Sequence, residues 1–193
     1  PRSTLFPYTT LFRSTSNATS GTSTIAVSGT GIAVVRTLEI SMDDSDFGDV
    51  AVGYSLTKTV TFTNTGNTTI NLNEIYTSSY NFTINNGNTY LYLYTSLAPG
   101  KSYKTDVTFS PSVNFSYSEY ISVYGGFING YMQYNITGTG VTPTRIIDIT
   151  MSGTDFGAVD AGYTSTQTMT INNSGNAALQ IEGYHISDAD FSA

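Results

Sequence analysis

The sequence predicts an all-β fold, arranged as antiparallel β-sandwiches in tandem. Apolar and polar residues alternate in short segments, as they do in strands that bury one face. The composition includes 18 Gly and 15 Tyr among 193 residues, and it favours strands joined by tight turns. Several short motifs also recur at one constant spacing, which indicates repeated domains.

The repeat has a period of 109 residues. Five landmarks return at this offset without a gap, so that Phe82, for example, corresponds to Phe191. The other landmark pairs are Gly29-Thr30-Gly31 with Gly138-Thr139-Gly140, Asp46-Phe47-Gly48 with Asp155-Phe156-Gly157, Gly53-Tyr54 with Gly162-Tyr163, and Thr65-Gly66-Asn67 with Ser174-Gly175-Asn176. This register predicts the final strand of a preceding repeat at 15–35, a complete repeat at 36–141 and the truncated first half of another at 142–193.

Residues 1–14 are interpreted as an artefactual leader. Residues 5–14 resemble the translation of a widely used sequencing-adapter oligonucleotide, because all ten codons match. The alternative is the end of a signal peptide, but the segment lacks the long apolar stretch that such a peptide needs. Residues 1–14 are therefore left out of the expected fold.

Within the complete repeat, alternation predicts the strands in order. Segment 56–64 is expected to point Val60 and Phe62 inward, and residues 64–67 form a turn because Gly and Asn tolerate positive φ. Segment 69–76 is the next strand, and Ile70, Leu72 and Glu74 are expected on one of its faces.

The second half of the repeat continues in the same way. Further strands are expected at 90–94, 103–109, 119–124 and 131–137, with a tight turn at 98–101. Their core side chains are expected to be Val107, Phe109, Ile121, Val123, Tyr134 and Ile136. About seven short strands in roughly 100 residues is the size of an Ig-like sandwich, so the fold class is all-β with tandem Ig-like antiparallel β-sandwiches.

These motifs together resemble the hydin/abnormal-spindle (ASH) type Ig-like domain and, in bacteria, the choice-of-anchor D repeats of large surface proteins. The residues that carry the resemblance are Asp46-Phe47-Gly48, Val60-x-Phe62-x-Asn64, Thr65-Gly66-Asn67, Leu97-Ala98-Pro99-Gly100, Val107-x-Phe109-x-Pro111 and Gly138-Thr139-Gly140. The Tyr-rich stretch 114–130 departs from the family's usual Gly-rich hairpin. The resemblance implies a scaffolding or binding module without catalytic activity, similar to the stalks of secreted or cell-surface proteins.

Charge and composition exclude several classes of function. The net charge is −7, and the seven basic residues are scattered, which argues against nucleic acid as a partner and disfavours anionic membrane surfaces. No run of 18 apolar residues is present, so no membrane span is expected in this fragment. Because the chain has no Cys, thiolate metal sites and Cys nucleophiles are excluded.

An acidic cluster supplies the only metal candidates. Carboxylates spaced like Asp43, Asp44, Asp46 and Asp49 can bind Ca²⁺. The counterparts in the next repeat are Ser152, Gly153, Asp155 and Ala158, so a single carboxylate is matched. A solvated acidic turn is therefore preferred over a calcium site.

No catalytic residues and no cofactor are expected. Asp46-Phe47-Gly48 occurs without a phosphate-binding loop or a His-Arg-Asp motif, so it is interpreted as the start of a strand with Phe47 in the core. His185 is the only histidine, whereas a triad or a zinc site needs several positioned groups. We interpret His185 as a strand-surface residue.

Three tyrosines form the candidate ligand or partner face. Tyr90, Tyr92 and Tyr94 alternate along one expected strand and therefore share a face. Tyrosine rings can stack on sugars or anchor a protein interface. The alternative is ordinary packing of a Tyr-rich sandwich.

The expected function is a non-catalytic structural or adhesive repeat module of a large secreted or cell-surface protein, located outside the cell or on its surface. Its expected partners are the neighbouring repeats of the same chain and a possible protein or glycan ligand. The alternatives are a carbohydrate- or protein-binding module, an accessory domain of a secreted hydrolase, or a cytosolic or ciliary scaffold domain.

Overall fold

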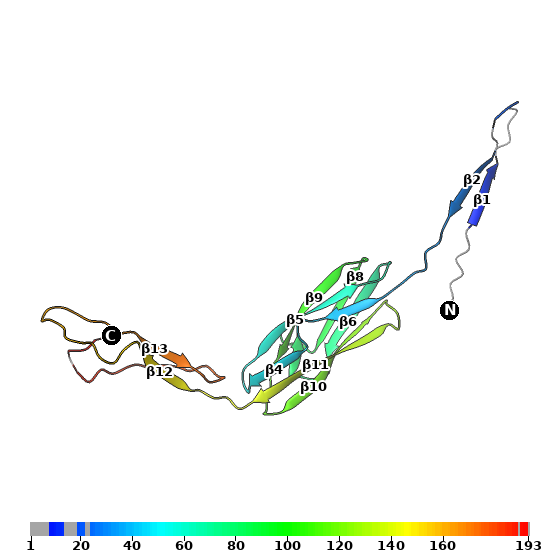
Figure 1. Ribbon diagram of the computed structural model, residues 1–193. Coiled ribbons are helices and arrows are strands. Elements are labelled where there is room, and N and C mark those ends of the chain that lie inside the picture. The colour runs from blue at the N-terminus through cyan, green and yellow to red at the C-terminus, as the bar shows by residue number, and fades with distance from the viewer. Residues whose placement is uncertain (1–7, 14–18, 22–23, 189, 193) are drawn as a thin grey trace.

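The structure is a computed structural model that describes residues 8–13, 19–21, 24–188 and 190–192. All secondary-structure elements in these ranges are β-strands, as the sequence predicts. A central sandwich lies between a hairpin near the N-terminus and a second hairpin near the C-terminus (Figure 1). No helix in the described part is long and apolar enough to cross a membrane.

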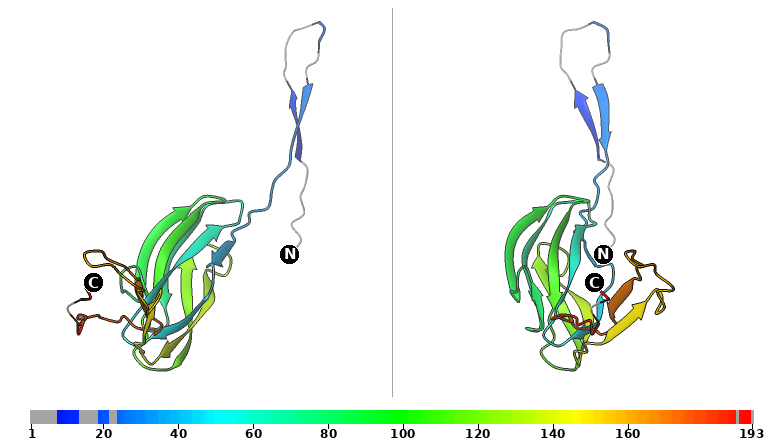
Figure 2. Two further views of the ribbon diagram at one scale, coloured as in Figure 1. Left: turned by 60° about the vertical axis from the view of Figure 1, so that its left-hand side comes forward. Right: turned by 90° about the vertical axis from the view of Figure 1, so that its left-hand side faces the viewer.

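The central sandwich contains nine strands in two sheets, two more than the sequence predicts. The strands are β3 (Leu38–Ser41), β4 (Asp46–Ala51), β5 (Leu56–Asn64), β6 (Ile70–Thr77), β7 (Phe82–Ile84), β8 (Tyr90–Leu97), β9 (Ser102–Phe109), β10 (Ser116–Gly125) and β11 (Tyr131–Val141). The five-stranded sheet has the order β4-β11-β10-β6-β8, and the four-stranded sheet has the order β3-β5-β9-β7. Neighbours are antiparallel except for the parallel pair β4–β11, and Figure 2 shows the two layers facing each other. The division of the chain at 36–141 stays a prediction.

The core lies between the two sheets, and the predicted inward residues form most of it. Val60, Phe62, Val107, Phe109, Ile121, Val123 and Ile136 are all fully buried. Tyr134 is only partly buried at the edge of this cluster. Burying one side chain of this size stabilises a fold by about 1.5–3 kcal/mol, so these positions determine which face of each strand turns inward.

Three phenylalanine rings close one part of the core. Phe47 is 3% exposed, which confirms its expected place in the core. Its ring lies 5.3 Å from that of Phe82 and 5.9 Å from that of Phe109, measured between centroids. The sequence interpretation did not include β7, whose three residues place Phe82 and Ile84 in the core.

The expected position of Glu74 on the same face as Ile70 and Leu72 is wrong. The pairing of β6 with β8 shifts between Leu72 and Glu74, as at a β-bulge. The shift turns Ile75 into the core, where it is fully buried, and leaves Glu74 half-buried. A strict alternation of inward and outward residues cannot anticipate this extra residue.

The N-terminal hairpin pairs β1 (Tyr8–Arg13) with β2 (Thr24–Gly29) in an antiparallel register that joins Tyr8 to Gly29. The sequence interpretation expected a strand in 15–35, and β2 lies there. It excluded residues 1–14, so β1 was not expected. The adapter interpretation concerns the origin of the segment and stays a prediction. Its remaining positions, 1–7 and 14, lie outside the described residues.

The C-terminal hairpin pairs β12 (Ile147–Met151) with β13 (Met169–Asn173). In its register Ile147 pairs with Asn173. In the β3–β5 register Leu38 pairs with Asn64, and these two residues lie 109 positions before Ile147 and Asn173. Residues 155–160 are not a strand, although their counterparts form β4. In the sandwich β4 pairs with β11, and residues 142–193 include no counterpart of β11.

Candidate functional site

The candidate site is on the outer face of the five-stranded sheet. Along β8, Leu91 and Leu93 pack against the core, so the alternating positions Tyr90, Tyr92 and Tyr94 point away from it. These three tyrosines are 39%, 63% and 75% exposed. The structure therefore places them together on one face, as the alternation of the strand predicts.

The aromatic surface extends beyond β8. Six residues form what we call the tyrosine row, because each ring contacts the next: Tyr94, Tyr92, Tyr90, Tyr76, Tyr124 and Tyr131. The centroid distances between successive rings are 6.5, 4.6, 5.7, 6.0 and 4.8 Å, in that order. The row thus crosses β8, β6, β10 and β11, and it presents a continuous aromatic strip.

Sheet pairing explains why rings from four strands meet. Tyr76 is the direct partner of Tyr90 across β6 and β8, and their rings stack with an interplanar angle of 5°. Tyr124 is the partner of Tyr131 across β10 and β11. The strand order of the sheet therefore joins these two pairs, since β6 lies beside β10.

Sequence reasoning missed half of the row. Tyr76, Tyr124 and Tyr131 all lie at ends of predicted strands. Their positions at strand ends were the only sequence signal that could have pointed to their place in the row. Tyr117, Tyr120 and Tyr124 belong to the Tyr-rich stretch 114–130, which by sequence defined no site. The structure instead packs Tyr117 against Phe109, with centroids 5.5 Å apart.

Hydrogen bonds raise the pKa of two hydroxyl groups of the row. The Tyr90 hydroxyl donates to the Glu74 carboxylate, and this hydrogen bond raises the pKa of Tyr90 well above its ordinary value. A hydrogen bond with Tyr76 raises the pKa of Tyr124. Neutral hydroxyls and flat rings together can stack on a sugar ring or an apolar protein surface while offering hydrogen bonds at the edge.

The acidic cluster stabilises a turn. The Asp44 carboxylate accepts a hydrogen bond from the Asp46 amide at 2.9 Å, and this bond lowers the pKa of Asp44. Asp46 Oδ1 accepts from the Gly48 amide and from the Thr137 hydroxyl, both at 3.0 Å. Lys58 forms an ion pair with Asp44 at 3.5 Å.

These contacts use the two central carboxylates inside the turn. In the described part of the chain, no group of three or more His, Cys, Asp or Glu side chains is arranged to hold a metal ion. His185 is exposed, but it lies in a segment without strand structure rather than on the expected strand. Its counterpart Tyr76 is on β6, which is held between β8 and β10, and residues 142–193 include no counterparts of those strands.

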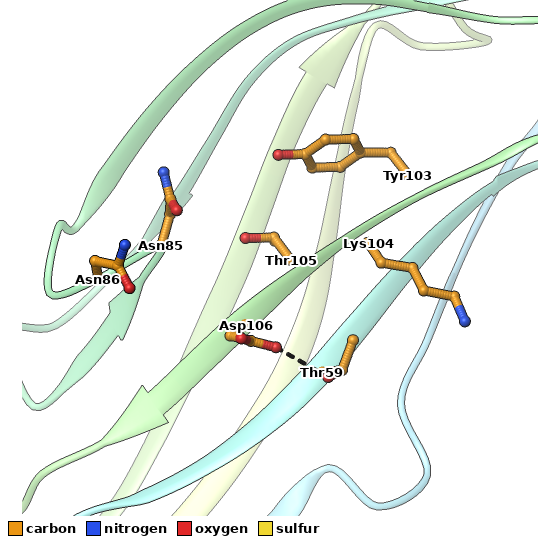
Figure 3. Close-up of a pocket in the computed structure, with 7 residues that line it drawn as sticks. All are labelled: Thr59, Asn85, Asn86, Tyr103, Lys104, Thr105 and Asp106. Carbon is orange, nitrogen blue, oxygen red and sulfur yellow. Dashed lines mark hydrogen bonds between the residues drawn. The ribbon is translucent and has the colours of Figure 1, made fainter.

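A small hollow lies on the four-stranded sheet (Figure 3). It has a volume of about 260 Å³. Its lining residues are Thr59, Asn85, Asn86, Tyr103, Lys104, Thr105 and Asp106. The Thr59 hydroxyl donates to Asp106 at 2.9 Å, and the Asp106 carbonyl accepts the Asn85 amide at 3.2 Å. The polar lining groups are thus partly engaged with one another, and the sequence did not point to this hollow.

The two facing sheets, with their mainly antiparallel strands, define the class of the protein as an Ig-like β-sandwich. Residues 36–125 match the family model described as HYDIN/CFA65/VesB-like, Ig-like domain. Residues 36–125 are therefore similar to HYDIN/CFA65/VesB-like Ig-like domains, and the predicted resemblance to the ASH type is confirmed at this level. No curated protein sequence matches the chain.

Solved structures of similar fold come from a human protein and from bacteria. The ASH/PapD-like domain 7 of human CEP192 is 12% identical, covers 56% of this chain and 87% of its own, and gives a TM-score of 0.38. The secreted serine protease VesC from Vibrio cholerae is 21% identical, with coverage of 55% and 24% and a TM-score of 0.41. The VesB protease of Vibrio cholerae is 13% identical, with coverage of 53% and 32% and a TM-score of 0.39. The similarity thus spans less than a third of either protease chain.

Proposed function

We propose that the central domain is a non-catalytic structural module in a tandem array of Ig-like repeats, carried by a secreted or cell-surface protein. The observation that carries this proposal is a set of hydrogen bonds that recurs 109 positions later. The recurring bonds hold the linker in front of each module. A linker held in this way sets the direction of the neighbouring module, which a free linker would not do.

The first copy of this linker clamp uses the side chain of Asn67. Its Oδ1 accepts a hydrogen bond from the Val35 amide at 2.8 Å, and its Nδ2 donates to the Ala33 carbonyl at 2.8 Å. The Asn67 amide also donates to the Val35 carbonyl at 3.0 Å. One side chain thus satisfies both kinds of backbone group in the linker.

The second copy uses Asn176. Its Oδ1 accepts from the Thr144 amide at 2.7 Å, and its Nδ2 donates to the Thr142 carbonyl at 3.1 Å. Each of these three residues lies 109 positions after its counterpart in the first clamp. The repetition of the same contacts supports two modules of one kind in the same chain.

The turn behind each clamp also recurs. The Gly66 amide donates to Asn64 Oδ1 at 2.9 Å, and the Gly175 amide donates to Asn173 Oδ1 at 3.0 Å. A Cβ atom on Gly66 would lie 2.3 Å from the Val35 carbonyl oxygen, and one on Gly175 would lie 2.3 Å from the corresponding oxygen of Thr144. Glycine is therefore required in both turns, because the linker backbone passes too close for a side chain.

The reading frame of the parent gene tests this proposal. We expect further copies of the repeat on either side of this chain, an export signal and an anchoring or secretion segment, and no catalytic domain. A frame without further repeats or an export signal would contradict the proposal. A catalytic domain of a hydrolase in the same frame would instead favour the role of an accessory domain.

A second candidate function is carbohydrate binding through the tyrosine row. The exposed rings of Tyr92 and Tyr94 support it, because aromatic rings placed side by side on a flat sheet can stack on successive sugars. We expect Tyr92→Ala to weaken binding about fivefold or more, since stacking interactions of aromatic rings are worth about 1 kcal/mol or more.

A glycan array followed by titration of any bound glycan measures this effect. Tyr80→Ala is the matched control, since Tyr80 is 88% exposed and lies outside the row. Binding that is equally strong in both variants, or no binding at all, would contradict a carbohydrate ligand. Capture of a protein that depends on Tyr92 would indicate a protein partner instead.

A further inference from the structure

The linker between the two modules is held from both sides. On the upstream side, Asn114 Nδ2 donates to the Thr142 hydroxyl at 3.1 Å. On the downstream side, Asn176 binds Thr142 and Thr144 in the linker clamp. Pro143 lies between these two points and has a fixed φ. The linker therefore has little freedom of its own.

A direct contact also joins the modules across this linker. The amide of Ala178 donates a hydrogen bond to the hydroxyl oxygen of Tyr54 at 3.1 Å. Tyr54 follows a tight turn of the central sandwich, whereas Ala178 follows the turn that contains Asn176. Arg145 Nε donates to the Ala178 carbonyl at 2.9 Å, so both backbone groups of Ala178 are engaged at the junction.

The local backbone explains why Tyr54 reaches the next module. Gly53 has a φ of 85°, a left-handed conformation that favours glycine, and it directs the chain around the turn. The Val52 amide donates to the Val141 carbonyl at 2.9 Å, which fixes this turn beside the point where the linker begins. Tyr54 is thus placed at the exit of the sandwich.

The counterpart of Tyr54 has the same local geometry and much greater exposure. Gly162 has a φ of 91°, and the Tyr163 amide donates to the Asp160 carbonyl at 3.0 Å, as the Tyr54 amide does to the Ala51 carbonyl at 2.9 Å. Tyr163 is 78% exposed, whereas Tyr54 is 36% exposed. The tyrosine that faces a following module is therefore the more covered of the two.

We infer that Tyr54 and the turn at 176–178 form a specific head-to-tail interface between successive modules, and that the partner for Tyr163 is the equivalent turn of a following module. This inference rests on the proposed tandem array. Each module carries a tyrosine at one end, whose hydroxyl oxygen accepts the hydrogen bond, and a turn with a donor amide at the other, as head-to-tail assemblies require. In the central module the corresponding donor turn ends at Thr69, the exposed counterpart of Ala178.

Amide hydrogen exchange of the whole chain, followed by NMR, tests the interface. We expect the Ala178 amide to be protected in the unchanged protein and to exchange about tenfold faster in Tyr54→Phe, because one hydrogen bond is lost. The Ala177 amide donates to the Thr144 carbonyl within its own module, so its exchange should not change. Tyr163→Phe is the matched control and should leave Ala178 unaffected.

Three results would overturn the interface: an unprotected Ala178 amide in the unchanged protein, equal effects of Tyr54→Phe and Tyr163→Phe, or no effect of Tyr54→Phe. Residual dipolar couplings give a second readout. A common alignment of β12–β13 and the sandwich is expected in the unchanged protein, and Tyr54→Phe should weaken this common alignment without abolishing it, because the linker clamp remains. A parent reading frame without further repeats would contradict the proposed tandem array but would leave the Tyr54–Ala178 contact in place. Failure of the array and failure of the interface are therefore distinguishable.

Discussion

At the residue scale, Lys58 links the acidic turn to the core. Its Nζ lies 5.2 Å from the centre of the Phe47 ring and donates to the carbonyl oxygens of Asp44 and Asp46 at 3.3 and 2.5 Å. In the C-terminal segment the equivalent position is Gln167, whose Nε2 donates to the Asp155 carbonyl at 3.3 Å. The position therefore needs a hydrogen-bond donor more than it needs a positive charge.

The pairing of Tyr90 with Glu74 gives a prediction for pH. Because the folded protein raises the pKa of the Tyr90 hydroxyl, the stabilisation from this bond is complete below the ordinary tyrosine pKa of about 10. It is lost only as the pH rises through the higher folded value. We expect Glu74→Ala to bring the pKa of Tyr90 back toward about 10.

Titration of ¹³C-labelled tyrosine ring carbons by NMR measures this change. Glu119→Ala is the control, since Glu119 accepts its hydrogen bond from Ser78. If Tyr90 titrates identically with and without the Glu74 carboxylate, the hydrogen bond does not set its pKa. In that case a group other than Glu74 determines the raised pKa of the Tyr90 hydroxyl.

At the element scale, alternation identified the long strands and failed at the short ones. β5 begins and ends at the residues predicted for it, because nine alternating residues carry a strong pattern. β7 has three residues, too few to show a period. The β6 bulge also escaped prediction, since it depends on how β8 pairs with β6 and not on either strand alone.

The same limit applies to the candidate site. The sequence could place Tyr90, Tyr92 and Tyr94 on one face, because neighbouring positions of a single strand fix that relation. It could not add Tyr76 and Tyr124, because their contact depends on β6 lying beside β10. Contacts between strands distant in sequence depend on sheet order, which local patterns do not encode.

At the scale of the whole molecule, the two faces of the central sandwich differ in character. The tyrosine row covers one sheet, whereas the other carries hydroxyl pairs such as Thr57 with Thr108, whose oxygens are 2.8 Å apart. The linkers leave from the two ends of the sandwich. This arrangement is compatible with the proposed tandem array, since contacts at the two ends of the sandwich leave the aromatic face uncovered.

The central sandwich and the C-terminal hairpin differ in how much core they bury. In the central sandwich the strands of β3–β11 enclose the core, whereas β12 and β13 pair only with each other. Ile147 and Ile149 are 49% and 57% exposed, although their counterparts Leu38 and Ile40 are buried. Open strand edges and exposed apolar side chains favour aggregation or partial unfolding of this segment.

Differential scanning calorimetry of the whole chain tests most directly the claim that residues 36–141 are the complete module. Unfolding absorbs about 0.7 kcal/mol of heat per cooperatively unfolding residue near 60 °C, so we expect one endothermic transition of about 75 kcal/mol for this module. The C-terminal hairpin should open locally without a transition of its own. A second cooperative transition, or a total of about 110 kcal/mol as expected if residues 36–193 all unfolded cooperatively, would contradict the account.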